Sequence, residues 1–198
     1  MYRLETALAR QLATDRPHRP SALDAFEAAR KRFIAGERIE MGALADEIGT
    51  TRVTLHRWVG SRDQLLGEVL WSLAEPTLRQ ARGATRRRGG KGIADAFGHF
   101  LQAVHDAPFF RTFLEREPEI ALRVLTTKNS ALQGHLVETM RDMLAAELTA
   151  GRLDPPMGLD DLAYIIIRLG ESFMYTDIIT GGNPDPDKAR RAVLALLR

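Results

Sequence analysis

Apolar residues recur at intervals of three and four along most of the chain, which is the spacing of one face of an α-helix. No segment shows the alternation of apolar and polar residues, bounded by turn residues, that is typical of a β-strand. The pattern therefore predicts an all-α protein. Near the N-terminus, Leu4, Leu8 and Leu12 lie on one stripe and predict a short extra helix, which is compatible either with an arm that reaches a partner or with a frayed terminus.

Two short helices separated by a tight turn are predicted within residues 44–59. The first helix ends at Gly49, a residue type that readily turns the chain after a helix. The second follows at once, because Thr50 and Thr51 are both suitable N-cap residues. One side of this second helix is apolar, and the other carries hydrogen-bond donors, as a helix that reads the major groove requires. We expect DNA contacts from Thr51, Arg52, Val53, Thr54, His56, Arg57 and Arg62.

Position along this segment predicts individual roles. Arg52 lies nearest the start of the second helix and is expected to reach a guanine edge, with Val53 beside a thymine methyl group. Ser61 and Gln64 match a capping box, so a further helix begins there. Arg62, in the first turn of that helix, is expected to pair with a phosphate.

The predicted elements divide the chain into two helical domains. Residues 1–67 comprise the N-terminal arm and a three-helix domain that contains the helix–turn–helix. The helix that begins at Ser61 continues to about residue 82, with a kink at Pro76, and connects this domain to residues 83–198. Residues 82–92 are rich in glycine and arginine and indicate a basic loop between the domains.

Charge is distributed unevenly between the two parts. Residues 1–90 hold 16 Lys and Arg against 11 Asp and Glu, whereas the remainder holds 12 against 15. The basic half is the half with the helix–turn–helix. Positive charge attracts the phosphate backbone without sequence preference, so the bias favours nucleic acid as a partner.

Composition argues against several other classes of protein. The chain has no cysteine and therefore no disulfide or thiolate metal site. It has neither a signal-peptide pattern nor a run of about 18 apolar residues, so we expect a cytoplasmic protein that does not span a membrane. Because the histidines lack metal-ligand spacing and no phosphate loop or nucleophile elbow occurs, we expect no metal, no cofactor and no enzymatic activity.

The helix–turn–helix is similar to that of the TetR family of one-component bacterial regulators, in which the pattern is roughly G-V-S-x-G-T-L-Y-x-x-F-x-S-K-x-x-L. The matching residues are Gly49, Thr51, Thr54, Leu55, Ser61, Arg62 and Leu65. The chain departs from the pattern at Val53, His56 and Val59, and has Arg62 for Lys, which affects the operator sequence more than DNA binding. The resemblance implies a homodimer on a palindromic double-stranded operator, with residues 83–198 binding a ligand and dimerising.

The second domain contains the residues of a possible small-molecule pocket. We expect its apolar walls to be Phe97, Phe100, Phe109, Phe113 and Met140, and its polar groups to be Arg111, Arg168, Glu171 and Tyr175. The alternative is that the aromatic and Met residues are ordinary core and that Arg168 pairs with Glu171 one turn later. Unpaired burial of the polar groups would cost several kcal/mol, so they need partners, a ligand among the possibilities.

Residues 159–180 are apolar on more than one face, which indicates burial against a partner subunit as well as the chain's own core. Gly170 lies within this predicted helix, where close approach of another backbone would justify it. In TetR-like regulators the last two helices of each subunit commonly form a four-helix bundle across a two-fold axis; the alternative is an intramolecular pair. The expected dimer contacts are Ile166, Gly170, Phe173, Val193 and Leu197.

The C-terminal half, with RLGESFMYTDIITGG and FFRTFLEREPE before it, is similar to the QsdR-type branch of the family. Such regulators are associated with lactone catabolism, which implies a lactone or acyl-type inducer whose carbonyl accepts from Arg111 or Arg168. We expect a repressor that the inducer releases from DNA. The alternatives are a DNA-binding protein with a solid second domain and a helical enzyme; a cavity of several hundred Å³ would favour the inducer.

Overall fold

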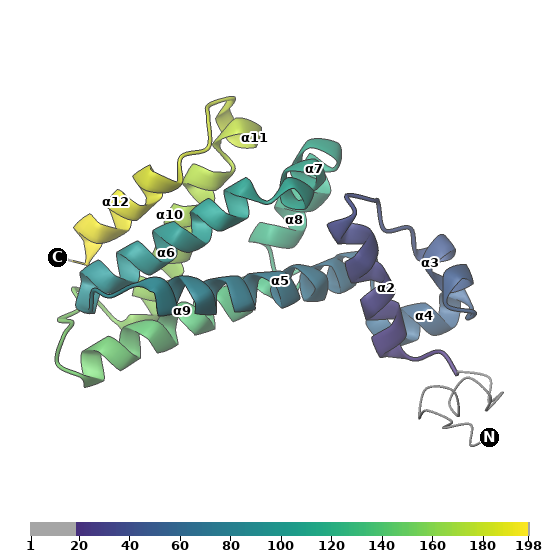
Figure 1. Ribbon diagram of the computed structural model, residues 1–198, viewed down its shortest axis with the longest axis horizontal. Coiled ribbons are helices and arrows are strands. Elements are labelled where there is room, and N and C mark those ends of the chain that lie inside the picture. The colour runs from purple at the N-terminus through teal and green to yellow at the C-terminus, as the bar shows by residue number, and fades with distance from the viewer. Residues whose placement is uncertain (1–18, 198) are drawn as a thin grey trace, which may run out of the picture.

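The computed structural model describes residues 19–197, so the helix expected over residues 1–12 lies outside the described residues. Every regular element within this range is a helix, which confirms the predicted fold class (Figure 1). The helices are α2 (Ala22–Ile34), α3 (Met41–Glu47), α4 (Arg52–Val59), α5 (Arg62–Ala84), α6 (Gly89–Asp106), α7 (Pro108–Arg116), α8 (Pro118–Thr126), α9 (Leu132–Thr149), α10 (Leu159–Met174), α11 (Thr176–Thr180) and α12 (Pro186–Leu196).

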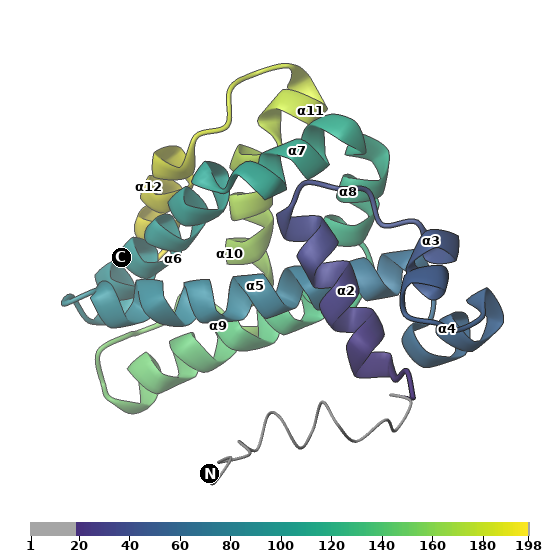
Figure 2. The same ribbon diagram turned by 45° about the vertical axis from the view of Figure 1, so that its right-hand side comes forward.

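Helices α2, α3 and α4 pack together with the first turns of α5 at one end of the molecule (Figures 1 and 2). Their shared core includes Ala29, Phe33, Leu44 and Leu55, all buried. The helix starts have sequence-encoded caps: α2 and α5 each begin with a complete capping box, and the side chain of Thr51 caps α4. This end is the predicted helix–turn–helix domain.

Helix α5 connects this domain to the rest of the chain and continues through Pro76 to Ala84. The basic loop that we expected over residues 82–92 is much shorter, because α6 already begins at Gly89. The glycines there serve close packing instead of forming a loop. A Cβ atom on Gly90 would lie 2.3 Å from the carbonyl oxygen of Leu197, so only glycine lets the start of α6 approach the end of the chain this closely.

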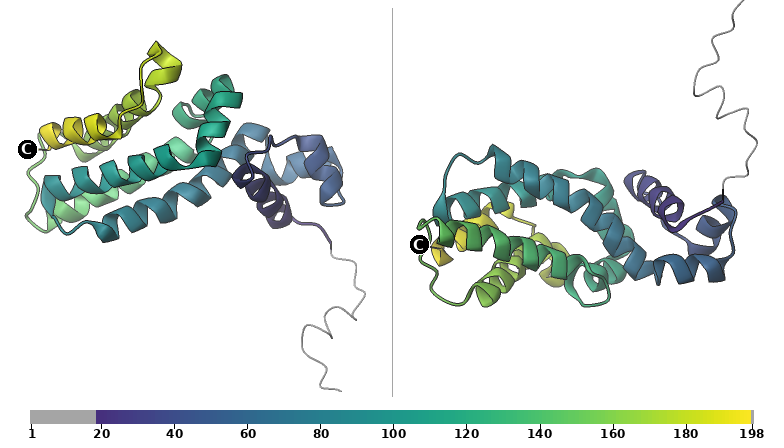
Figure 3. Two further views of the ribbon diagram at one scale, coloured as in Figure 1. Left: turned by 45° about the horizontal axis from the view of Figure 1, so that its top comes forward. Right: turned by 90° about the horizontal axis from the view of Figure 1, so that it is seen from below.

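The second domain is a bundle in which α6 packs against α5 and α12, and α10 packs against α9 and α12. Helices α7 and α8 lie at the end of this bundle that faces α2, a placement visible in Figures 2 and 3. Within residues 19–197, no helix is both long and apolar enough to cross a membrane.

Candidate DNA-binding surface and ligand pocket

Helix α4 has a well-defined start built from two threonines. The backbone amide of Thr54 donates to Oγ1 of Thr51 over 3.1 Å, and the Thr51 hydroxyl donates to that of Thr54 over 3.0 Å. Between them, the Val53 side chain is 81% exposed. An apolar side chain this exposed on the first turn of a helix is placed to contact an apolar group of a partner.

The basic residues of α4 point away from its buried Leu55. Arg52, His56 and Arg57 are all exposed. Among residues 19–197, Arg52 and Arg57 form no ion pair and no side-chain hydrogen bond, whereas most other arginines in this range have a partner. Two unpaired guanidinium groups on one short helix therefore remain available to an anionic partner.

Arg62 differs from our expectation of a phosphate contact. Its side chain is only 16% exposed and is held by two groups of the protein itself. Nε donates to the carbonyl oxygen of Ile39 over 2.6 Å, and Nη2 donates to Oε1 of Glu117 over 2.7 Å. Because the guanidinium group is hydrogen-bonded to both of these groups, Arg62 forms a contact between the two domains in this structure.

Edge-to-face contacts between aromatic rings extend the contact between the domains. The ring of Phe33, in α2, lies 5.8 Å from the ring of Phe109 and 5.3 Å from that of Phe113, both in edge-on orientation. Such aromatic pairs contribute about 0.5–1.5 kcal/mol beyond the burial of their area. Helix α7 is thus packed directly against the helix–turn–helix domain.

Two further arginines of the second domain reach the first. Arg123, in α8, makes a double contact with the carboxylate of Asp63, over 2.6 and 3.2 Å. Arg116, at the end of α7, donates to the carbonyl oxygen of Gly36 over 3.0 Å. Together with Arg62 and Phe33, these contacts join the DNA-binding end to α7 and α8.

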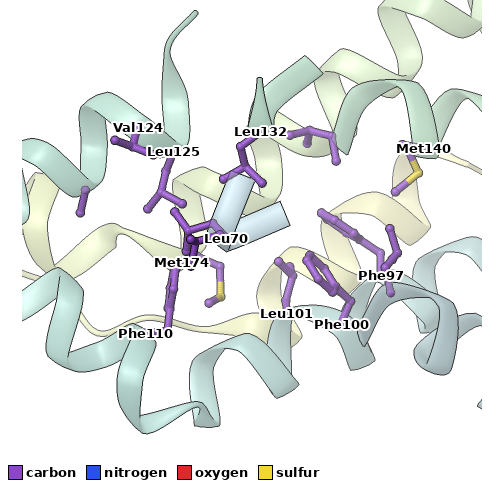
Figure 4. Packing of buried hydrophobic residues seen from close by; sticks show 14 of the residues in the cluster. Leu70, Phe97, Phe100, Leu101, Phe110, Val124, Leu125, Leu132, Met140 and Met174 are labelled. Carbon is purple, nitrogen blue, oxygen red and sulfur yellow. The ribbon is translucent and has the colours of Figure 1, made fainter. Parts of the chain in front are cut away.

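A cavity of about 100 Å³ lies between α5 and the helices of the second domain. Phe110, Leu125, Leu132 and Met174, which are labelled in Figure 4, come from four different helices and line it. Its volume is smaller than the several hundred Å³ that we expected for an inducer site. Its lining residues are Leu70, Leu73, Ala74, Thr77, Phe97, Phe100, Leu101, Ala103, Val104, Ala107, Phe109, Phe110, Leu125, Leu132, Leu136, Ile167, Gly170, Glu171, Met174 and Tyr175.

Five of the nine residues that we expected in a pocket line this cavity. They are Phe97, Phe100, Phe109, Glu171 and Tyr175. Helices α5, α8 and α9 also contribute to the lining, mostly with leucines that we did not expect there. Leucines at helical spacing look the same in a sequence whether they fill a core or face a cavity, so no signal distinguished them.

The other four expected residues lie elsewhere. Phe113 packs on Phe33, and Met140 is fully buried in the core. Arg111 is exposed on α7, so it does not reach the cavity as the expected donor to a ligand carbonyl. Arg168 does not line the cavity either, because its guanidinium donates to Oε2 of Glu171 and to the carbonyl oxygen of Thr126.

Glu171 is the charged residue of the cavity wall and is buried there. Its Oε2 accepts from Arg168, whereas its Oε1 is buried without a hydrogen-bond partner in the protein. Burial raises the pKa of Glu171 to about 7, against the lowering effect of the Arg168 charge. Burial and the nearby charge of Glu171 also raise the pKa of Tyr175 well above its usual value.

The expected dimer contacts require a correction, because most of them are buried inside a single chain. Ile166 and Val193 are fully buried, and Leu197 is nearly so. A Cβ atom on Gly170 would lie 2.5 Å from Cζ of Phe97, so this glycine accommodates its own chain's α6. Phe173 alone among the five is partly exposed.

Within residues 19–197, no cluster of three or more His, Asp or Glu side chains is placed to hold a metal ion.

Comparison with known proteins places the chain in a family. Residues 88–198 match the family described as tetracyclin repressor-like, C-terminal domain. The chain is similar to the R. erythropolis transcriptional repressor QsdR from the TetR family, with 26% identity, a TM-score of 0.83, and coverage of 89% of this chain and 93% of that chain. It shares its fold with RolR in complex with resorcinol, at 14% identity, a TM-score of 0.66, and coverage of 89% and 86%. Comparison with curated protein sequences gives no match. Because the family match spans more than half of the chain, the protein belongs to the TetR family of transcriptional regulators.

Proposed function

We propose that the protein is a homodimeric repressor that binds a palindromic operator and leaves it when a small molecule occupies the cavity lined by Glu171. The observation that carries the DNA-binding part is the pair of unpaired guanidinium groups, Arg52 and Arg57, beside the exposed Val53 on α4. The similarity to QsdR, which is described as a transcriptional repressor, supports repression over activation.

The side chains of α4 suit distinct contacts with DNA. Arg52, on the first turn, is assigned to a guanine edge, and Val53 to a thymine methyl group. Arg57 and His56 lie further along the helix and are assigned to phosphates. Thr51 and Thr54 hold the start of the helix through their mutual hydrogen bond and present their remaining polar atoms to the backbone of DNA.

Phe109 connects the cavity to the DNA-binding end. It lines the cavity and also packs edge-on against Phe33 of α2. A ligand that displaces Phe109 therefore changes the packing of α2 against α7. Because coupling between two binding sites is reciprocal, operator DNA must weaken ligand binding by the same factor.

A dimer supplies the second recognition helix that a palindromic site requires. We assign its interface to the outer side of α10, where Ile165, Leu169 and Phe173 form a partly exposed stripe at intervals of four residues and Tyr164, 51% exposed, lies at the edge of that side. An exposed aromatic residue beside these apolar side chains is typical of a surface covered by a partner. This assignment keeps Phe173 and replaces the other four contacts that we expected from the sequence.

Selection from a random duplex library with the purified full-length protein tests the DNA-binding proposal. We expect enrichment of a palindrome whose half-site centres lie about one helical turn apart, roughly 10 base pairs. The matched control is the Arg52→Ala, Arg57→Ala double variant, which should enrich the palindrome more weakly and without preference at the base pair assigned to Arg52. If the natural protein enriches no sequence, or if the variant enriches the same palindrome to the same extent, α4 is not the reading element.

Native mass spectrometry of the purified protein tests the inducer separately. Small molecules released from the protein are identified and then added back to its complex with the selected duplex. An inducer should weaken that complex, whereas a molecule that binds without any effect on DNA affinity would contradict ligand-controlled release. Failure of this step leaves the DNA-binding proposal intact.

A further inference from the structure

The cavity is apolar except at one end. Most of its lining consists of aliphatic and aromatic side chains, with polar atoms supplied by Thr77, Glu171 and Tyr175. The Thr77 hydroxyl already donates to the carbonyl oxygen of Leu73 over 2.7 Å. The hydrogen-bonding capacity that the protein leaves unused is therefore concentrated around Glu171 and Tyr175.

Oε1 of Glu171 is the atom that lacks a partner. The other carboxylate oxygen, Oε2, is bound by Arg168, which also fixes the orientation of the carboxylate. A buried acceptor without a partner costs about 1–3 kcal/mol, and more when it is charged. A single water molecule is poorly suited to donate to Oε1, because buried water needs two to four polar partners and the surrounding wall is mainly apolar.

We propose that the cavity binds a small, mainly apolar molecule that carries a hydrogen-bond donor, a hydroxyl or an amino group, and that Oε1 of Glu171 accepts from this donor. This inference rests on the proposed function of the cavity as an inducer site. The apolar body of the molecule lies among Phe97, Phe100 and Met174, and its donor lies at the Glu171 end.

The volume of the cavity limits the size of the molecule. At about 100 Å³, it is close to the apolar cavities of about 150 Å³ that bind benzene in engineered proteins. A molecule with a single six-membered ring and one polar substituent has the size that this volume allows. Long acyl chains require the cavity to enlarge.

The proposal also changes the chemistry that we inferred from the QsdR-type resemblance. A simple lactone offers only acceptors, and we had assigned Arg111 or Arg168 to its carbonyl. Arg111 is exposed outside the cavity, and Arg168 is already bound to Glu171 and Thr126. The unused group of the cavity is an acceptor, so it selects for a donor on the ligand.

Three isosteric probes separate these possibilities: cyclohexanol, cyclohexylamine and cyclohexanone. The first two carry a neutral and a cationic donor, and the third only an acceptor. Binding to the full-length protein is followed by NMR through the methyl resonance of Met174, which lines the cavity. At about pH 8.5, where the carboxylate of Glu171 is ionised and can only accept, we expect cyclohexanol or cyclohexylamine to bind at least about tenfold more tightly than cyclohexanone. The tighter of the two donors shows whether the natural group is neutral or cationic.

The Glu171→Gln variant separates a change in hydrogen bonding from a general loss of packing, because a packing defect would not change which probe binds more tightly. Its amide oxygen takes the place of Oε2 on Arg168, which leaves the amide nitrogen, a donor, facing the cavity. The variant should therefore lose the donor preference and bind cyclohexanone more tightly than cyclohexylamine, which has no acceptor, and at least as tightly as cyclohexanol, whose oxygen can also accept from the amide. Glu138→Gln, at an exposed position of α9, is the matched control and should keep the natural preference.

The inference is overturned if cyclohexanone binds as tightly as both donors, if the Glu171→Gln variant retains the donor preference, or if no probe binds at tens of millimolar. A separate measurement of DNA affinity with each probe bound keeps the two proposals distinguishable. Donor-selective binding that leaves DNA affinity unchanged would contradict ligand-controlled release but not the chemistry of the cavity.

Discussion

The guanidinium group of Arg62 donates to Oε1 of Glu117 over 2.7 Å and so joins the first turn of α5 to the junction of α7 and α8. Both side chains are largely buried, with exposed fractions of 16% and 10%. Arg38 lies 3.4 Å from the other carboxylate oxygen of Glu117. A buried pair of this kind is sensitive to loss of one partner, because the remaining charge is left uncompensated.

We predict that Arg62 and Glu117 are energetically coupled. In a double-mutant cycle, the two single Gln variants should each lower the free energy of unfolding by about 3 kcal/mol, and the double variant by less than their sum. Thermal or urea unfolding measures these values. The coupling energy is expected to be about 1–3 kcal/mol.

Arg79 and Glu75 supply the control cycle, because this i,i+4 pair lies on the surface of α5 with exposed fractions of 70% and 45%. Its coupling should be about 0.3–0.5 kcal/mol. Equal coupling in the two cycles would mean that the contact between Arg62 and Glu117 contributes no more than a surface pair, and the assignment of Arg62 to the interface would fail.

Arg52 should determine sequence preference rather than general affinity. Arg52→Ala is expected to weaken binding to the selected operator by about 1–3 kcal/mol and to relax the preference at one base pair in each half-site. Arg57→Ala is the comparison, since loss of a phosphate contact weakens binding to every sequence and reduces the salt slope by about one. Fluorescence anisotropy on operator and random duplexes distinguishes them. A uniform loss with Arg52→Ala would make it a phosphate contact.

The fold is largely predictable from local signals in the sequence. The capping boxes at Ser21 and Ser61 fix the starts of α2 and α5, and Gly49 marks the turn between α3 and α4. Helix caps and turns depend on residues that are only a few positions apart, so they can be recognised without knowledge of the tertiary structure. The contact between Arg62 and Glu117 spans 55 residues and depends on how α7 packs against α2, which no local pattern encodes.

The cavity was only partly predictable for a related reason. Aromatic residues such as Phe97 and Phe109 stand out in the sequence, and both do line the cavity. Phe113 looks the same in the sequence, yet packs on Phe33 outside it. Which face of α7 points inward is decided by tertiary packing. Gly170 illustrates the same limit, because its close neighbour is a ring of the same chain.

The proposed dimer interface predicts an effect of charge at Tyr164. Tyr164→Arg places a cation on the outer side of α10, and desolvation of this charge at an apolar interface should shift the protein toward monomer and weaken operator binding. Sedimentation velocity measures the oligomeric state. Leu148→Arg is the control, since Leu148 is a similarly exposed apolar residue, at 41% against 51%, near the end of α9. If both variants sediment as the natural protein does, the interface lies elsewhere.

Glu171 should make the stability of the protein depend on pH in a predictable direction. Its pKa is raised to about 7 in the folded state by burial, whereas in the unfolded chain it is about 4.3. The folded protein therefore holds the proton more tightly, so the stabilisation is complete below pH of about 4.3 and is lost as the pH rises through 7. The full loss is about 4 kcal/mol at most.

The Glu171→Gln variant cannot ionise at this position, so it should not lose this stability. Its free energy of unfolding should rise relative to that of the natural protein as the pH increases from 5 to 8, whereas Glu138→Gln should follow the natural protein throughout. The raised pKa of Tyr175 keeps that hydroxyl neutral over this range, so the slope reports on Glu171. Parallel pH profiles of Glu171→Gln and the natural protein would show that Glu171 ionises in the folded state as easily as in water, which would remove the physical basis for a buried acceptor in the cavity.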